Sequence, residues 1–185
     1  MDMDTTPLKR TRRDAGFTLI DMLFVVALIG LLASMAIPGL MKARGAAQAS
    51  SALGTMRVVN SAELSFAITC GLGFYAPDLP TLGVPPPGST EPFLSDEMSS
   101  AFTFTKSGYN FSLAGTGLAG APASCNGLAA GQASPGYAAV ADPLDPGGAP
   151  RYFGTNSDGV IYQHSATLSA TMPEAGGPPA GAPIQ

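Results

Sequence analysis

The stretch that decides the fold begins with Gly16-Phe17-Thr18-Leu19-Ile20-Asp21 and continues as MLFVVALIGLLASMAIPGLM from Met22 to Met41. The second part contains no Asp, Glu, Lys, Arg or His, and ten of its residues are Leu, Ile, Val or Phe. About 20 such residues in an α-helix, at roughly 1.5 Å each, cross the roughly 30 Å hydrocarbon layer of a bilayer. We therefore expect residues 17–41 to form a membrane-spanning helix.

The energetics of this segment favour insertion into a bilayer. Leu, Ile, Val and Phe each contribute roughly −0.3 to −0.6 kcal/mol near a helix centre, which gives about −3 to −6 kcal/mol for the ten residues. An aspartate at the centre would cost roughly 3 kcal/mol, and Asp21 lies near the end, where the cost is smaller.

The apolar pattern changes after Lys42 from continuous to helical spacing, which predicts an amphipathic helix over residues 42–70. The basic residues Lys42, Arg44 and Arg57 and the acidic Glu63 are expected on the other faces. Gly71 and Gly73 then end the helix, giving a total length of roughly 75 to 80 Å. The side chains expected to face the core are Ala49, Ala52, Met56, Val59, Ala62 and Phe66.

Residues 71–171 are predicted to form a β-rich globular head, because the chain has 23 Gly and 17 Pro and many short apolar runs. Ser107-Gly108 and Asp158-Gly159 are turn signals. Runs with period-two alternation predict strands at Tyr109–Leu113, Tyr137–Ala141, Arg151–Phe153 and Val160–Gln163.

Three other segments remain, and proline content decides the expectation for two of them. Six prolines between Tyr75 and Pro92 exclude a regular helix or a central strand there, which predicts an extended surface connection. A short helix is expected within Phe93–Ala101. The last segment, residues 172–185, consists largely of Pro, Gly and Ala and is expected to be disordered.

Residues 1–16 are predicted to be a basic leader on the cytoplasmic side that is cleaved off. They contain four basic and three acidic residues, so the remaining chain has five basic and ten acidic residues. Such an excess of negative charge disfavours binding of nucleic acids.

The segment Ala15–Val26 closely resembles the class III signal of type IV pilins and type II secretion pseudopilins. In that family the pattern is Gly, Phe, Thr, Leu, Ile, Glu and then hydrophobic residues, and the match extends from Gly16 to about Met41. The resemblance implies an α+β pilin fold, in which a long N-terminal helix packs on a small antiparallel sheet. It also implies that an aspartyl prepilin peptidase cuts between Gly16 and Phe17 and methylates the new amino group of Phe17.

Asp21 is the unusual residue of this motif, because a carboxylate near the end of a membrane-spanning helix is costly unless it is paired. In the family the corresponding Glu neutralises the terminal amine of a neighbouring subunit, which implies pairing of Asp21 with Phe17 of another copy. Aspartate is shorter than glutamate by one methylene. The alternative is a solvated residue at the helix start.

Pro38 and Gly39 are expected to bend or locally melt the helix, since proline removes one backbone hydrogen bond and clashes with the preceding turn. Many members of the resembled family have a proline at this point.

The two cysteines, Cys70 and Cys125, lie beyond the apolar run. If that run anchors or exports the chain, they reach an oxidising compartment and are expected to form a disulfide. The alternative is a pair of buried free thiols.

No catalytic function or cofactor is expected. His164 is the single histidine, and no recognisable nucleophile motif occurs. Three aspartates suggest a calcium site, but Asp-Pro dipeptides are equally turn signals, and turns are the preferred interpretation. These aspartates are Asp142, Asp145 and Asp158.

The sequence therefore predicts a structural subunit of a type IV pilus-like filament, used in adhesion, motility or uptake. It would be a single-pass protein of the inner membrane before assembly and part of an extracellular or periplasm-spanning filament afterwards. The implied partners are pilin subunits, prepilin peptidase, inner-membrane assembly machinery and lipid. The alternatives are a pseudopilin of a type II secretion system and a secreted protein whose ordinary signal is cut after Ala36.

The cleavage prediction is tested by N-terminal analysis of the mature protein, which should begin with N-methyl-Phe17. Gly16→Val should leave the full precursor in the membrane, because a β-branched side chain then blocks access to the scissile bond. A mature protein beginning at Ile37 would establish the ordinary secretory signal instead.

Overall fold

The computed structural model describes residues 16–145 and 151–184, so the predicted leader lies outside the described residues except for Gly16. The chain divides into two compact units, residues 1–41 and 42–185. Helix α1 (Leu19–Thr69) supplies the described helix of the first unit and continues into the second.

The end of α1 is set by hydrogen bonds that two glycine N–H groups donate to carbonyls of the last turn. The N–H of Gly71 donates to the carbonyl of Phe66 at 2.7 Å, and the N–H of Gly73, where φ is 94°, donates to that of Ala67 at 2.9 Å. A Cβ atom at Gly71 would lie 2.1 Å from the carbonyl oxygen of Phe74, so only glycine fits there. The predicted stop after about Cys70 is thus where the helix ends.

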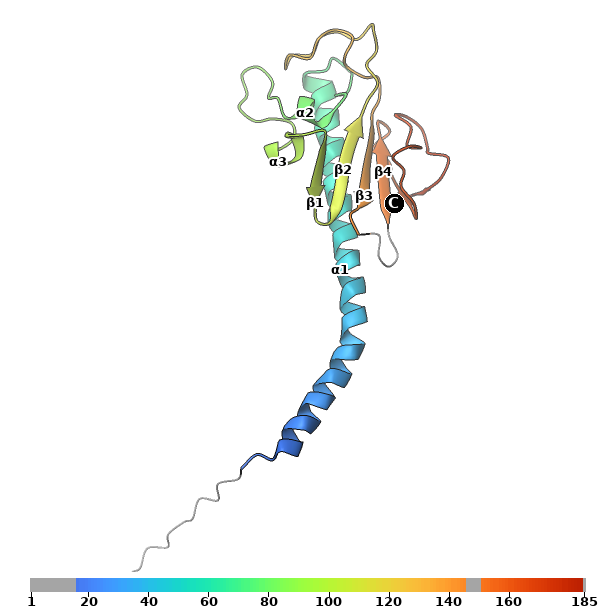
Figure 1. Cartoon of the computed structure of the whole chain (residues 1–185). Helices are drawn as coiled ribbons and strands as arrows, with labels where there is room; N and C mark the ends of the chain where they lie inside the picture. Colours follow the sequence, from blue (N-terminus) through green and yellow to red (C-terminus); the bar gives the residue numbers. More distant parts are fainter. Residues whose placement is uncertain (1–15, 146–150, 185) are drawn as a thin grey trace, which may run out of the picture. The chain divides into compact units, whose positions relative to one another are not determined.

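Within the described residues, six antiparallel strands form the sheet of the head, in the same order as in the chain, with the second part of α1 against one face (Figure 1). The predicted strands and both predicted turns are present. Ser107 and Gly108, with φ of 50° and 80°, join the first two strands. The strands are β1 (Thr103–Lys106), β2 (Tyr109–Ala114), β3 (Ala138–Pro143), β4 (Tyr152–Asn156), β5 (Ile161–His164) and β6 (Ala182–Pro183).

The main core lies between α1 and the sheet, and all six α1 side chains predicted to face it are buried. They pack against aromatic residues of the strands, including Phe111 and Phe153. Asn60 fixes the helix over the sheet, because its amide donates to Thr155 Oγ1 at 2.9 Å and accepts from the Tyr137 hydroxyl at 3.0 Å. The predicted α+β architecture is therefore confirmed.

Two short helices connect α1 to the sheet, α2 (Leu79–Leu82) and α3 (Asp96–Ser99), the latter inside the predicted helical range. The exclusion of helix from the proline-rich segment was wrong at α2. Pro80 lies in the first turn, where a missing N–H leaves no hydrogen bond unmade. The Asp78 carboxylate caps this turn by accepting from the N–H of Thr81 at 2.9 Å.

The prediction of a disordered C-terminal segment is also corrected, because residues 172–184 pack against the sheet. Leu168 and Met172 pack on Val140, on the sheet face opposite α1. The Asn156 amide donates to the carbonyls of Pro173 and Gly176, and β6 pairs with β5. Side chains of the sheet thus make the apolar and polar contacts that the Pro, Gly and Ala residues of this segment cannot make with one another.

The predicted disulfide between Cys70 and Cys125 is confirmed, with a separation of 55 residues. The N–H of Cys125 also donates to the carbonyl of Cys70 at 3.1 Å. The bond therefore joins the end of α1 to the loop between β2 and β3.

Replacing Cys70 and Cys125 together by Ser should lower the free energy of unfolding of the head by roughly 4 kcal/mol, since a loop of this length loses its covalent closure. Denaturant unfolding of the detergent-solubilised chain measures this change. Reductant should produce the same loss in the wild type and none in the variant. An unchanged midpoint in both would contradict the prediction.

Glu63 was predicted on a polar face of α1, and this expectation was wrong. Its side chain is fully buried; Oε2 accepts the N–H of Ala76 at 2.9 Å, and Oε1 has no hydrogen-bond partner among the described residues. Burial raises the pKa of this carboxyl well above its usual range, against the Ala76 hydrogen bond that lowers it, and Asp78 raises the pKa further. The surroundings of this carboxyl therefore favour its neutral form in the folded head.

This buried carboxyl should make the head less stable as the pH rises. Below the unfolded pKa, near 4.5, both states are protonated and stability is full. Above it the unfolded state ionises first, which lowers the free energy of unfolding by about 1.4 kcal/mol per pH unit until the folded pKa is reached.

Glu63→Gln should remove most of this slope in denaturant titrations at successive pH values, because Gln keeps an oxygen for Ala76 without a proton to lose. Glu91→Gln, at an exposed carboxylate, is the matched control and should leave the slope unchanged. Equal slopes in the wild type and Glu63→Gln would contradict this interpretation.

Candidate functional site

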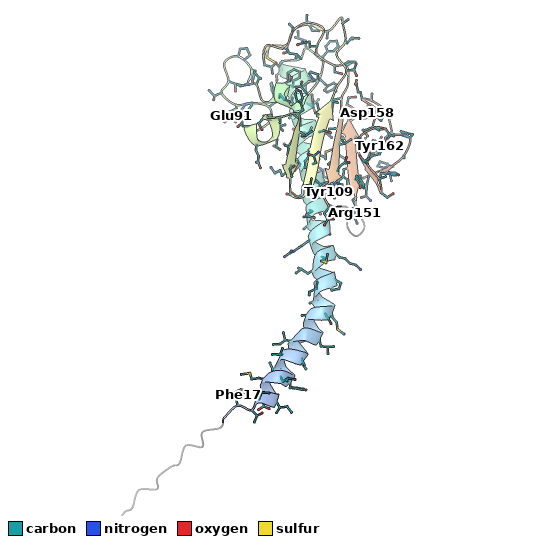
Figure 2. All side chains as sticks on the ribbon, in the orientation of Figure 1. Phe17, Glu91, Tyr109, Arg151, Asp158 and Tyr162 are labelled. Carbon is teal, nitrogen blue, oxygen red and sulfur yellow. A yellow bond between two sulfur atoms is a disulfide. The ribbon has the colours of Figure 1, made fainter. Side chains whose placement is uncertain are left out.

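The first unit exposes an apolar surface along its whole described length. Every side chain from residue 16 to residue 48 is exposed, including Phe17 at 79% and Leu19 at 82% of its area. Phe17 marks the beginning of this segment in Figure 2. By length and hydropathy, α1 qualifies as a membrane-spanning helix, and none of its most apolar 18-residue window is buried. The surface requires a nonaqueous environment or partner chains.

Thr18 and Asp21 form a reciprocal cap at the start of α1. Asp21 Oδ2 accepts from the Thr18 hydroxyl at 2.5 Å and from the Thr18 N–H at 3.2 Å, while the Asp21 N–H donates to Thr18 Oγ1 at 3.3 Å. This is a capping box, in which two side chains satisfy N–H groups that a helix start leaves free. The helix therefore begins two residues after the expected cleavage point.

The cap leaves part of the Asp21 carboxylate available. Its Oδ1 atom makes no hydrogen bond within the described residues, although Oδ2 is occupied by Thr18. The structure thus supports the interpretation of Asp21 as a helix-start residue. The Oδ1 atom is left to accept a hydrogen bond from an amine.

The bond between Gly16 and Phe17 lies outside regular secondary structure, just before α1. A Cβ atom at Gly16 would meet nothing within 4 Å. A larger residue there therefore causes no clash within the described chain, and any effect of Gly16→Val on processing would come from the peptidase.

Helix α1 is continuous through Pro38 and Gly39. Pro38 has no N–H, so the carbonyl of Ser34 lacks its usual helical donor. The Ser34 hydroxyl makes a separate hydrogen bond, to the carbonyl of Leu31 at 2.7 Å. Local melting is not present in this structure, and a bend at these residues stays a prediction.

The residues considered for metal or catalytic chemistry make separate local contacts. Asp142 accepts the Thr167 hydroxyl, Asp158 accepts the N–H of Gly176, and His164 Nδ1 accepts the N–H of Ala166. Residues 16–145 and 151–184 contain no group of three or more His, Cys, Asp or Glu side chains that could hold a metal ion. Asp142 and Asp158 therefore each hold a neighbouring loop segment of the head.

Thr18 is the residue of this site that the sequence interpretation missed. The signal was present, because Thr-Leu-Ile-Asp before an apolar run has the capping-box spacing of a hydroxyl residue followed three positions later by an acid. The resemblance implied roles for Gly16, Phe17 and Asp21 but none for Thr18.

Comparisons with known proteins identify the same segment. Residues 11–37 match the family described as "Prokaryotic N-terminal methylation motif". The Type IV major pilin protein PilA of Myxococcus xanthus (strain DK1622) is 41% identical over 54 residues, which are 29% of this chain. The match spans about a quarter of that relative's length, 24%. No solved structure matches.

The chain therefore carries the N-terminal methylation signal of type IV pilin and pseudopilin precursors. Its architecture, a long helix packed on a small antiparallel sheet, fits the pilin fold that the signal implied.

Proposed function

We propose that this chain is the structural subunit of a type IV pilus-like filament that assembles through the first part of α1. The observation that carries the proposal is a helix that is apolar, has only exposed residues over 22–41 and begins at a methylation signal. A surface of this kind is stable in a bilayer before assembly and among other copies afterwards.

Processing supplies the switch between these two states. Prepilin peptidase removes residues 1–16 and methylates the amine of Phe17, and the apolar segment stays on the mature chain. The single span then holds the subunit in the inner membrane with its head and disulfide on the oxidising side. Assembly machinery in the same membrane moves it into the filament.

Asp21 directs the stacking of subunits. In the filament its carboxylate enters an apolar helix bundle, where an unpaired charge would cost several kcal/mol. The free Oδ1 atom accepts a hydrogen bond from the charged amine of Phe17 of a neighbouring copy, while Oδ2 keeps the hydrogen bonds from Thr18. One carboxylate thus caps its own helix and neutralises its neighbour.

The pilus is preferred over a secretion pseudopilus because the similar protein from Myxococcus xanthus is described as a major pilin. A pilus subunit works outside the cell in adhesion, motility or uptake. Shearing intact cells and pelleting the released material tests this directly. Filaments on the cell surface support the pilus, and filaments confined to the periplasm support the pseudopilus.

Two variants separate the assembly role of Asp21 from its capping role. Asp21→Asn keeps an oxygen for Thr18 and removes the charge, so it should lower the filament yield severalfold while processing stays near normal. Thr18→Ala removes the cap and keeps the charge, so it should reduce the yield much less. Sheared filaments are quantified by pelleting, and processed subunit by blotting.

Asp21→Glu is the conservative control and should assemble at least as well as the wild type, since glutamate reaches one methylene further. If Asp21→Asn assembles normally and Thr18→Ala does not, the carboxylate serves the helix start alone, and the pairing proposal is wrong.

A further inference from the structure

The head carries a preformed surface groove that the proposed function does not use. It has a volume of about 490 Å³ and lies between the outward face of α1 and the loop before α3. Figure 2 labels Glu91 on this loop. The lining residues are Val58, Ser61, Ala62, Ser65 and Thr69 from α1 and Pro86, Glu91, Pro92 and Phe93 from the loop.

The loop wall of the groove is held in place by the core. The ring of Phe93 packs edge-on against that of Phe66, with centroids 5.5 Å apart. The N–H of Leu94 donates to the carbonyl of Leu82 at 3.0 Å. The amide of Asn126 donates to the carbonyls of Thr81 and Val84 at 2.8 and 3.2 Å. These contacts fix the loop wall of the groove against the core.

The helix wall is suited to another helix. Ser61, Ser65 and Thr69 recur every four residues, and such a row of small side chains lets a second helix approach closely. The exposed Leu64 and Ile68, at 54% and 73% of their areas, stand beside this row. An exposed apolar strip next to a groove marks an interaction surface.

The charge in the groove indicates which helix fits. Glu91 is exposed, and its carboxylate makes no hydrogen bond or ion pair within the described residues, where the recorded ion pair is Lys106 with Glu97. A partner for Glu91 therefore carries a basic group on a narrow helix.

We propose that the groove receives α1 residues 42–51 of a second copy of this chain, with Lys42 or Arg44 paired to Glu91. This stretch reads KARGAAQASS; Lys42 and Arg44 are exposed among mostly small residues, and Ala49 faces the core of its own head, so the other face of the helix would enter the groove. Between Asp21 and Glu63 the helix has no acidic residue, so no repulsion opposes the contact. The inference rests on the proposed filament.

The contact defines a second neighbour relation. Groove residues 58–69 and the bound residues 42–51 differ by about 17 positions, or roughly 25 Å along parallel helices. Pairing of Asp21 with Phe17 spans four positions, or roughly 6 Å. One copy therefore makes the two contacts with different neighbours. Both contacts join unlike surfaces, which is the kind of contact that an open helical filament requires.

Charge reversal in the full chain tests the groove. Glu91→Lys should lower the yield of sheared filaments roughly two- to tenfold. Adding Lys42→Glu or Arg44→Glu should restore it. Asp96→Lys, which makes the same charge change on α3 outside the groove, is the control and should assemble normally. An intact Cys70–Cys125 disulfide by peptide mapping verifies that each head is folded.

Cross-linking within assembled filaments identifies the occupant. Glu91→Cys combined with Arg44→Cys should give ladders of linked subunits with a short bis-maleimide, whereas either cysteine alone should not. Linking of Glu91→Cys to Phe24→Cys instead would place the membrane-spanning segment in the groove and overturn the inference.

The outcomes separate this inference from the proposed function. Wild-type filaments with full yield for Glu91→Lys, or a loss that neither second substitution restores, would overturn the groove contact and leave the filament intact. Absence of wild-type filaments would overturn the proposed function and this inference with it.

Discussion

The structure depends on one constraint, which is that a single helix must satisfy two different environments. Beyond residue 48, α1 turns one face to the sheet and completes the core of the head. Before that residue no side chain has a core to enter. The head can therefore fold around its own part of the helix, while the first part depends on lipid or other chains. The core of the head and the exposed apolar surface are thus divided along one continuous helix.

Much of this division could be predicted from residue spacing. The uninterrupted apolar run and the later helical recurrence of Ala52, Met56, Val59 and Phe66 differ in period, and the structure follows both. The disulfide was predictable because an exported chain with two cysteines has a single pairing available. Gly71 predicted the helix end because the backbone approaches closely there.

The failures share a physical cause, which is that tertiary partners outweighed local composition. Glu63 looks like a surface residue in sequence, but the N–H of Ala76 and the closing of the head place it inside. The C-terminal segment has few side chains to bury, yet the amide of Asn156 and the apolar side chain of Val140 hold it on the sheet. Glu91 had no sequence signal, because a groove between a loop and a helix arises only from the fold.

The edges of the sheet limit how heads can join. At one edge, β6 has two residues, and Pro183 has no N–H to offer another strand. At the other edge, β1 has four residues and ends at Lys106, a charged residue that disfavours strand addition. Both edges of the sheet therefore disfavour strand pairing between two heads, which is the contact that begins amyloid-like aggregation. Contacts between heads must therefore use surfaces other than the edges of the sheet.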